Sequence, residues 1–181
     1  YYIGSLKSLI NHNILTLESI QNYVCCSSGC LLGLLLNLNY SLSFIEKFTY
    51  SYNFEQILDY DDLCDLFHKN GLFSIDKLKK IIISLIYQKV KQKDVTLLKL
   101  HQLTGKDLVL KVYNYTKQQT EYINYKTNPH LKIATAICMS CCIPIFFKPI
   151  YYDNCYYIDG GFTGVTPILS NPKYSRSFTF I

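Results

Sequence analysis

An uncharged stretch from residue 20 to 38 places the tightest limit on the fold of this 181-residue chain. A membrane-spanning helix needs ~20 mostly apolar residues in one regular pattern. This stretch instead changes its periodicity at Ser27 and Ser28, and it contains several polar residues. A buried strand that ends at the two serines, followed by a buried helix, explains the pattern better. We therefore predict a strand–turn–helix here and no membrane span.

The composition predicts an ordered domain that does not bind nucleic acid. Hydrophobic residues make up 49% of the chain and charged residues 17%, which argues against disorder, and the length suits one domain with a real core. The net charge is only +5, and the densest group of lysines, between residues 77 and 93, falls on an amphipathic helical pattern. A solvated helix face explains these lysines better than nucleic acid does, with attraction to anionic lipid as a weaker alternative.

The eight cysteines predict buried, reduced thiols. Most lie in apolar runs, and adjacent pairs such as Cys25–Cys26 make a poor disulfide framework, which favours a reducing compartment. We therefore expect an intracellular protein, either soluble or peripherally associated with a membrane. Cys138-x-x-Cys141 has a metal-like spacing but lacks a second pair, so we predict no metal and no cofactor.

Helical and strand-like patterns alternate through much of the chain, which is typical of an α/β layered fold. No internal repeat, linker or low-complexity segment interrupts them. Strands are predicted at residues 20–26, 108–113, 121–125, 150–152, 155–158 and 177–181. Helices are predicted at residues 1–12, 28–38, 42–49, 61–69, 76–90, 96–103 and 131–142.

Ser27 has the surroundings of a nucleophile. A serine hydroxyl needs exposure and a base, and a sharp strand–turn–helix elbow with small residues two before and two after it provides the exposure. Gly29 is the second small residue, whereas Cys25 occupies the first position, where glycine is usual. The alternative interpretation is that the serines only cap a helix, because serine is a favoured cap.

Asp159 is the candidate base. It follows a strand-like run and precedes Gly160 and Gly161, a loop that can hold a carboxylate at the end of a strand. The alternative is an ordinary Asp-Gly turn. Histidine is the more usual base for a serine nucleophile, but none of the four histidines lies in a motif. His130, at a predicted helix start, is kept only as a remote candidate.

With these segments the chain resembles the patatin-like phospholipase family. The family's G-x-S-x-G elbow is similar to residues 25–29 (CCSSG), and its D-G-G/A loop is similar to residues 156–162 (YYIDGGF). Further similar segments, in order, are residues 2–6 (YIGSL), 70–73 (NGLF), 103–108 (LTGKDL) and 134–144 (ATAICMSCCIP). The resemblance implies a three-layer α/β fold with a central, mostly parallel sheet flanked by helices. It also implies one patatin-like domain over residues 1–181.

The resemblance implies a lipid acyl hydrolase that works without metal. Ser27 would attack a carboxylic ester of a phospholipid or another acyl lipid, Asp159 would act as general base, and the Ser28 N–H would stabilise the oxyanion. Peripheral contact with a membrane is expected. In the family a Gly-rich oxyanion loop precedes the position of Tyr1, so we expect an N-terminal truncation, with a C-terminal truncation left open.

Two alternatives remain at this point. The chain could be a catalytically inactive patatin-like domain that binds lipid or a protein partner. It could also be an unrelated α/β scaffold in which Ser27 and Asp159 never meet. The head group, the ester position and the oligomeric state are not predicted.

Overall fold

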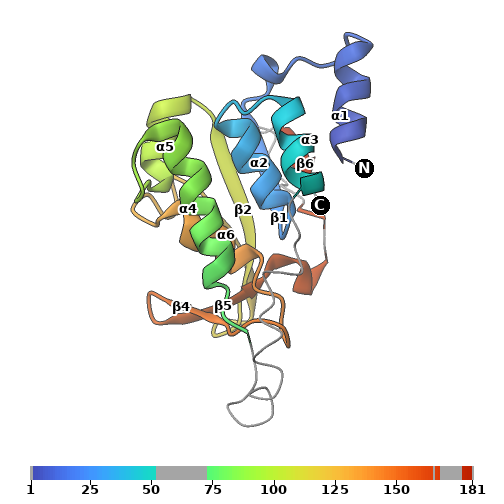
Figure 1. Ribbon diagram of the computed structural model, residues 1–181. Helices are drawn as coiled ribbons and strands as arrows, with labels where there is room; N and C mark the ends of the chain where they lie inside the picture. The colour runs from blue at the N-terminus through green and yellow to red at the C-terminus, as the bar shows by residue number, and fades with distance from the viewer. Residues whose placement is uncertain (1, 52–72, 165, 168–176, 181) are drawn as a thin grey trace.

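A computed structural model describes residues 2–51, 73–164, 166–167 and 177–180 of the chain (Figure 1). Within these residues the strands are β1 (Asn22–Cys26), β2 (Asp107–Asn114), β3 (Gln119–Ile123), β4 (Ile150–Tyr152), β5 (Cys155–Asp159) and β6 (Ser177–Phe180). The α-helices are α1 (Tyr2–Asn11), α2 (Gly29–Asn37), α3 (Leu42–Ser51), α4 (Asp76–Val90), α5 (Leu97–Thr104) and α6 (Ile133–Ser140). Short 3-10 helices are η1 (Leu17–Ser19) and η4 (Gly160–Thr163). The α/β class is as predicted.

The sheet is less parallel than the sequence analysis predicted. Among the described strands, β1 pairs in parallel with β2 and with β6, but the pairs β2–β3, β2–β5 and β4–β5 are antiparallel. Short connections account for two of these antiparallel pairs, β2–β3 and β4–β5, because a tight turn can join only antiparallel strands. β2 and β5 are joined by a long connection that contains α6. Asp153 and Asn154, between β4 and β5, both have positive φ (47° and 58°), as a two-residue hairpin turn requires.

Strand β2 brings the ends of β1 and β5 together. Residues 110 and 111 of β2 pair with both β1 and β3, so these two strands lie on opposite edges of β2. Residues 112–114 pair with both β3 and β5, so β5 also lies opposite β3. β1 and β5 therefore share one edge of β2 and meet end to end, with Cys26 opposite Lys111 and Asp159 opposite Val112.

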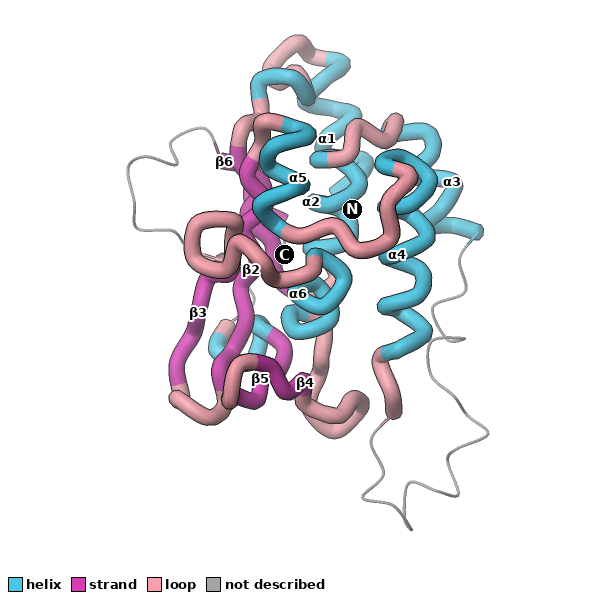
Figure 2. Tube along the Cα trace, turned by 90° about the vertical axis from the view of Figure 1, so that its left-hand side faces the viewer, coloured by secondary structure: helices cyan, strands magenta, loops and turns pink. Residues whose placement is uncertain are grey.

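The helices cover an apolar core beside this sheet. Figure 2 shows α2, α5 and α6 next to the strands, with α3 and α4 further from the sheet. α2 is almost entirely apolar and buried, as expected of a helix packed on several sides. Its buried residues join those of β1, β2, α4 and α6 in one core cluster. No helix within the described residues is long and apolar enough to cross a membrane.

The predicted elements match the observed ones to within a few residues, apart from the helix at residues 61–69. That helix, with Cys64 and His68, lies outside the described residues. Both ends of α5 follow the expected chemistry. Thr96 caps its start by accepting a hydrogen bond from the Lys99 N–H, and Gly105 ends it with a left-handed backbone conformation.

Candidate active site

Ser27 occupies a sharp elbow between β1 and α2. Its φ is +52°, a value that non-glycine residues seldom adopt, and such strain concentrates at functional sites. The elbow is held from both sides of the residue. The Ser27 N–H donates to Ser140 Oγ at 3.0 Å, and the Ser27 carbonyl accepts from the Cys30 N–H at 2.9 Å. The strain is therefore maintained by hydrogen bonds to α6 and within the first turn of α2.

Cys25 fits the elbow because a glycine faces it. The Cys25 side chain is fully buried against Gly33 of α2, and a Cβ atom at residue 33 would lie under 3.0 Å from Cys25 Sγ. The larger residue at the first small position is thus accommodated by the space that Gly33 leaves. Cys25 and Gly33 form one packing unit behind Ser27.

Asp159 ends β5 and caps the short helix η4. Its N–H donates to the Cys142 carbonyl at 2.9 Å, and its Oδ1 accepts from the Gly161 N–H at 2.6 Å. A Cβ atom at Gly160 would lie under 3.0 Å from the backbone carbonyl of Lys111. Glycine at position 160 therefore lets the aspartate loop lie directly on β2.

The two segments meet at the dyad. Ser27 Oγ donates to Asp159 Oδ2 at 2.6 Å, a short bond of the kind a carboxylate acceptor gives. Burial raises the pKa of the Asp159 carboxyl above its usual value. Hydrogen bonds from Ser27 and Gly161, and the charge of Lys111, act in the opposite direction. The structure thus brings together the two residues that the sequence analysis singled out.

A family comparison fits this geometry. The sequence profile described as Patatin-like phospholipase matches residues 1–171. The chain belongs to the patatin-like phospholipase family. The three-layer class expected from that resemblance agrees with a mixed α/β structure whose central sheet is flanked by helices.

Viral relatives and one solved structure resemble this patatin-like chain. "Probable lipid hydrolase 463L" of Invertebrate iridescent virus 6 is 30% identical over 184 residues, which cover 96% of this chain and 59% of that protein. An uncharacterized protein of Acanthamoeba polyphaga mimivirus is 26% identical over 168 residues, covering 92% and 55%. The crystal structure of VipD from Legionella pneumophila superposes with a TM-score of 0.67 at 17% identity, over 98% of this chain and 46% of VipD. The chain therefore spans little more than half the length of the two viral relatives.

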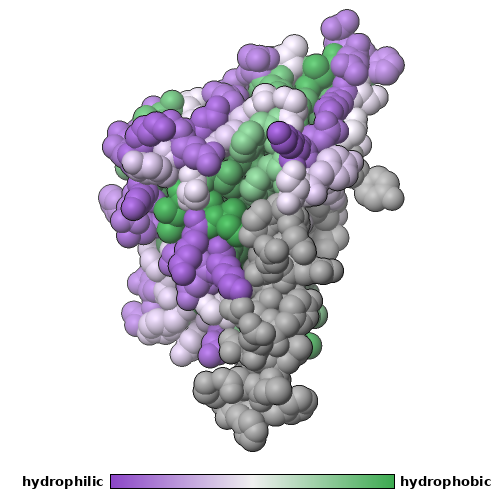
Figure 3. Space-filling view, in the orientation of Figure 1, coloured by the Kyte–Doolittle hydropathy of each residue, from purple (hydrophilic) through white to green (hydrophobic). Residues whose placement is uncertain are grey.

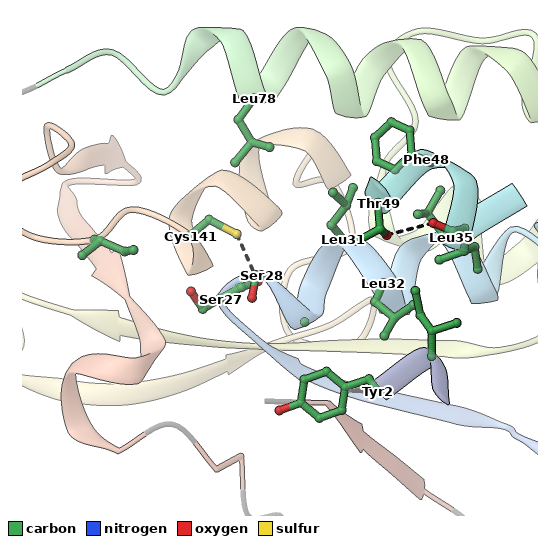
Figure 4. Close-up of a pocket in the computed structure, with 14 residues that line it drawn as sticks. Tyr2, Ser27, Ser28, Leu31, Leu32, Leu35, Phe48, Thr49, Leu78 and Cys141 are labelled. Atoms are coloured by element: carbon green, nitrogen blue, oxygen red, sulfur yellow. Dashed lines mark hydrogen bonds between the residues drawn. The ribbon is translucent and has the colours of Figure 1, made fainter. Parts of the chain in front are cut away.

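An apolar cavity of about 400 Å³ opens beside Ser27 in this patatin-like domain. Figure 4 shows Leu31, Leu32 and Leu35 of α2 along it, facing Phe48 of α3. The remaining lining residues are Tyr2, Ile3, Ser27, Ser28, Gly29, Ile45, Thr49, Leu78, Cys141 and Ile143, and none of the fourteen is charged. On the molecular face of Figure 3, apolar residues gather between α4 and α3. The cavity can hold a hydrocarbon chain with one end at Ser27.

Two residues of the site escaped the sequence analysis. Ser140 is fully buried at the end of α6. Its hydroxyl accepts a hydrogen bond from the Ser27 N–H and donates one to the Lys111 carbonyl at 2.6 Å. Lys111 lies in β2 beside the aspartate loop and is also buried. Ser140 falls inside the segment that resembles the family, but a serine at a helix end carries no signal of its own.

The three described histidines make their contacts away from the dyad. His101 pairs with Asp107 at 2.8 Å and stacks on Tyr125, and the His12 ring bonds to the Ser8 carbonyl. His130 is exposed in a turn. Among the described residues no histidine contacts Ser27 or Asp159, so His130 has no support as a base here.

The described cysteines are free and buried, as the sequence predicts. Burial raises the pKa of the Cys26 thiol to about 11 and that of Cys142 to about 12, so both are uncharged at neutral pH. Cys141 donates its thiol to the Ser27 carbonyl at 3.0 Å. Within the described residues, no group of three or more His, Cys, Asp or Glu side chains could hold a metal ion.

Proposed function

We propose that the chain is a lipid acyl hydrolase of the phospholipase A kind, with Ser27 as nucleophile and Asp159 as general base. The observation that carries the proposal is the 2.6 Å bond from Ser27 Oγ to Asp159 Oδ2 at the end of an uncharged apolar cavity. Family membership and the printed name of the iridescent virus relative, a probable lipid hydrolase, support the same chemistry.

The reaction proceeds in two acyl transfers. Asp159 takes the hydroxyl proton as Ser27 Oγ attacks the ester carbonyl, forming a tetrahedral oxyanion. The C–O bond to the alcohol then breaks, and the leaving oxygen receives the proton from Asp159. Asp159 next takes a proton from water, which attacks the acyl-enzyme. Return of that proton to Ser27 Oγ releases the fatty acid.

The Ser28 N–H is the oxyanion donor that the described residues offer. Ser28 follows the nucleophile and precedes α2, whose first N–H groups and dipole favour negative charge at this end. One such donor contributes on the order of 10²–10³ in rate. A second donor would come from the Gly-rich loop that the family places before the position of Tyr1.

The substrate is a lipid because the cavity beside the nucleophile is apolar. Each methylene that leaves water there contributes about 0.8 kcal/mol to binding. Because none of the fourteen described lining residues is charged, the cavity favours an acyl chain over a polar acyl group. We therefore assign the acyl chain to the channel between α2 and α3 and the head group to the solvent side of Ser27.

Peripheral contact with a lipid surface is also part of the proposal. Ile145 is 81% exposed and Phe146 is 49% exposed, and both follow Ile143, which lines the cavity. We expect I145D to reduce sedimentation with phosphatidylcholine vesicles, whereas I14D, at an exposed residue outside the segment that follows Ile143, leaves it unchanged. Equal vesicle binding by I145D and the unaltered protein would rule out this contact.

The decisive experiment compares S27A and D159N with the unaltered protein on phospholipid and p-nitrophenyl ester substrates. Both this chain and the full open reading frame that encodes it are assayed. We expect a loss of at least ~10³-fold in kcat/KM for each variant, and no change for H130Q. If both variants retain activity, the dyad is wrong. If neither protein is active while lipid binding persists, the inactive lipid-binding domain is the better description.

A further inference from the structure

Lys111 is a buried lysine next to the dyad. Only 4% of it is exposed, although lysine is almost never buried without a partner for its charge. Among the described residues, its Nζ bonds to the carbonyl oxygen of Gly164, which directly follows η4. No carboxylate of the described residues forms an ion pair with it. A cation kept in this position calls for a role in the site.

Lys111 contacts both halves of the dyad through its backbone. Its carbonyl accepts the hydroxyl of Ser140, which in turn accepts the Ser27 N–H. The same carbonyl lies against Gly160, and a Cβ there would also lie 3.1 Å from Lys111 Cγ. Cys26 pairs with Lys111 across the strands, and Asp159 pairs with the next residue, Val112. One residue of β2 thus touches the supports of both catalytic groups.

The charge of Lys111 acts on Asp159. Asp159 is only 5% exposed, and burial opposes its ionisation. The other titratable groups that face it are Cys26 at the end of β1 and Cys141 and Cys142 after α6. Burial raises the pKa of each of these thiols, so they are uncharged at neutral pH. The hydrogen bonds from Ser27 and Gly161 offset this burial first, and Lys111 is the cation among the described residues that adds to them and lowers the pKa of that carboxyl.

We propose that Lys111 is a positioning residue of the dyad: its ammonium group fixes the aspartate loop through Gly164, and its charge keeps Asp159 ionised as the base. This inference rests on the proposed function, because it assigns the lysine a role toward the same base. It adds a residue that neither the elbow nor the D-G-G loop contains.

The test separates charge from hydrogen bonding. K111Q retains a donor for the Gly164 carbonyl and removes the charge, K111M removes both, and K111R keeps both. The pH profile of kcat/KM is measured for each on a soluble p-nitrophenyl ester. An ionised base gives a profile that falls on the acid side. Without the cation this acid limb should move to higher pH. K111R should keep the limb near its original pH.

The control is K117M, which removes an exposed lysine in the turn after β2 and should leave the profile unchanged. Circular dichroism shows whether K111M is folded. If it is not, the comparison of K111Q with K111R decides whether the charge of Lys111 acts on Asp159. An acid limb that stays in place in K111Q, or that moves as far in K111R as in K111Q, overturns the assignment of Lys111. If S27A and D159N are inactive, the dyad survives that result. If both are active, the dyad and the role of Lys111 fall together.

Discussion

The two halves of the site are built by opposite means. In the elbow half, β1 and α2 pack on each other through apolar side chains, with Cys25 against Gly33 and a nearly all-apolar helix behind Ser27, while hydrogen bonds hold the turn at Ser27 itself. The aspartate half, β5 with η4, is held by polar contacts, among them the Gly161 N–H to Asp159 and Lys111 to Gly164.

This difference separates two kinds of sensitivity. Close packing responds to volume, because interiors leave little room for an added methyl group. Polar contacts in a buried loop respond to charge and to pH. The elbow half should therefore tolerate changes of pH and fail on changes of size. The aspartate half should depend strongly on charge and, at Gly160, where its loop lies on β2, also on size. Glycines in each half allow the contrast to be tested.

The largest effect is expected for G160A in the aspartate half. An added Cβ meets the Lys111 backbone, which cannot rotate away, so the loop must shift and carry Asp159 with it. A displacement of about 1 Å costs on the order of 10²-fold in rate. Ester hydrolysis and thermal melting are measured together. The control is G4A on α1, where a Cβ meets nothing within 4 Å, and full activity in G160A would contradict the geometry.

The next effect is a loss of stability in the elbow half. G33A places a methyl group against Cys25 Sγ and should cost about 1–3 kcal/mol in the free energy of unfolding. Because the obstacle is one sulfur atom, C25A should recover much of that loss in the double variant. Urea unfolding of both single variants and the double variant gives the coupling energy. Additive losses would show that the two residues do not form one packing unit.

Six of the fourteen described residues that line the cavity belong to the elbow and α2, namely residues 27–29, 31, 32 and 35, and none of the fourteen comes from β5 or η4. L32W should therefore change acyl-chain selectivity without changing the pH profile. The bulky side chain should lower the ratio of kcat/KM for a long-chain ester to that for butyrate by ~10-fold or more. L103W, on the exposed side of α5, is the matched control. An unchanged ratio in L32W would place the acyl chain elsewhere.

The smallest effect is on stability and concerns Asp159. Burial raises the pKa of this carboxyl in the folded chain above the unfolded value, so between the two values the folded chain binds more protons. Stability therefore falls as pH rises through this interval, and the full cost is present above the folded-state pKa. D159N should melt at a higher temperature than the unaltered protein at pH 7, with the gap closing as pH falls.

S27A serves as the control for that measurement, because it keeps the carboxylate and removes its hydrogen bond. It should show no gain in melting temperature. A D159N variant that melts below the unaltered protein at every pH would mean that the contacts of the carboxylate outweigh the cost of burying it.

The sequence predicted the elements and both dyad residues but neither Lys111 nor the antiparallel pairing of β2 with β5. Leu108, Leu110 and Val112 alternate with Val109, Lys111 and Tyr113, and this pattern reads as a strand with one apolar face. The structure buries residues on both faces, with the loop after Asp159 lying over Lys111. Strand order and loop placement depend on contacts between distant segments, which local patterns do not contain.

The shared edge of β2 has a consequence for how the chain would gain the proposed activity during folding. β1 and β5 do not pair with each other, and each reaches its place by docking on β2 from a different part of the chain. A folding intermediate with only one of them docked would have a nearly complete core on that side and no catalytic pair. Recovery of esterase activity after refolding should therefore follow the slower docking event, later than the recovery of helical circular dichroism.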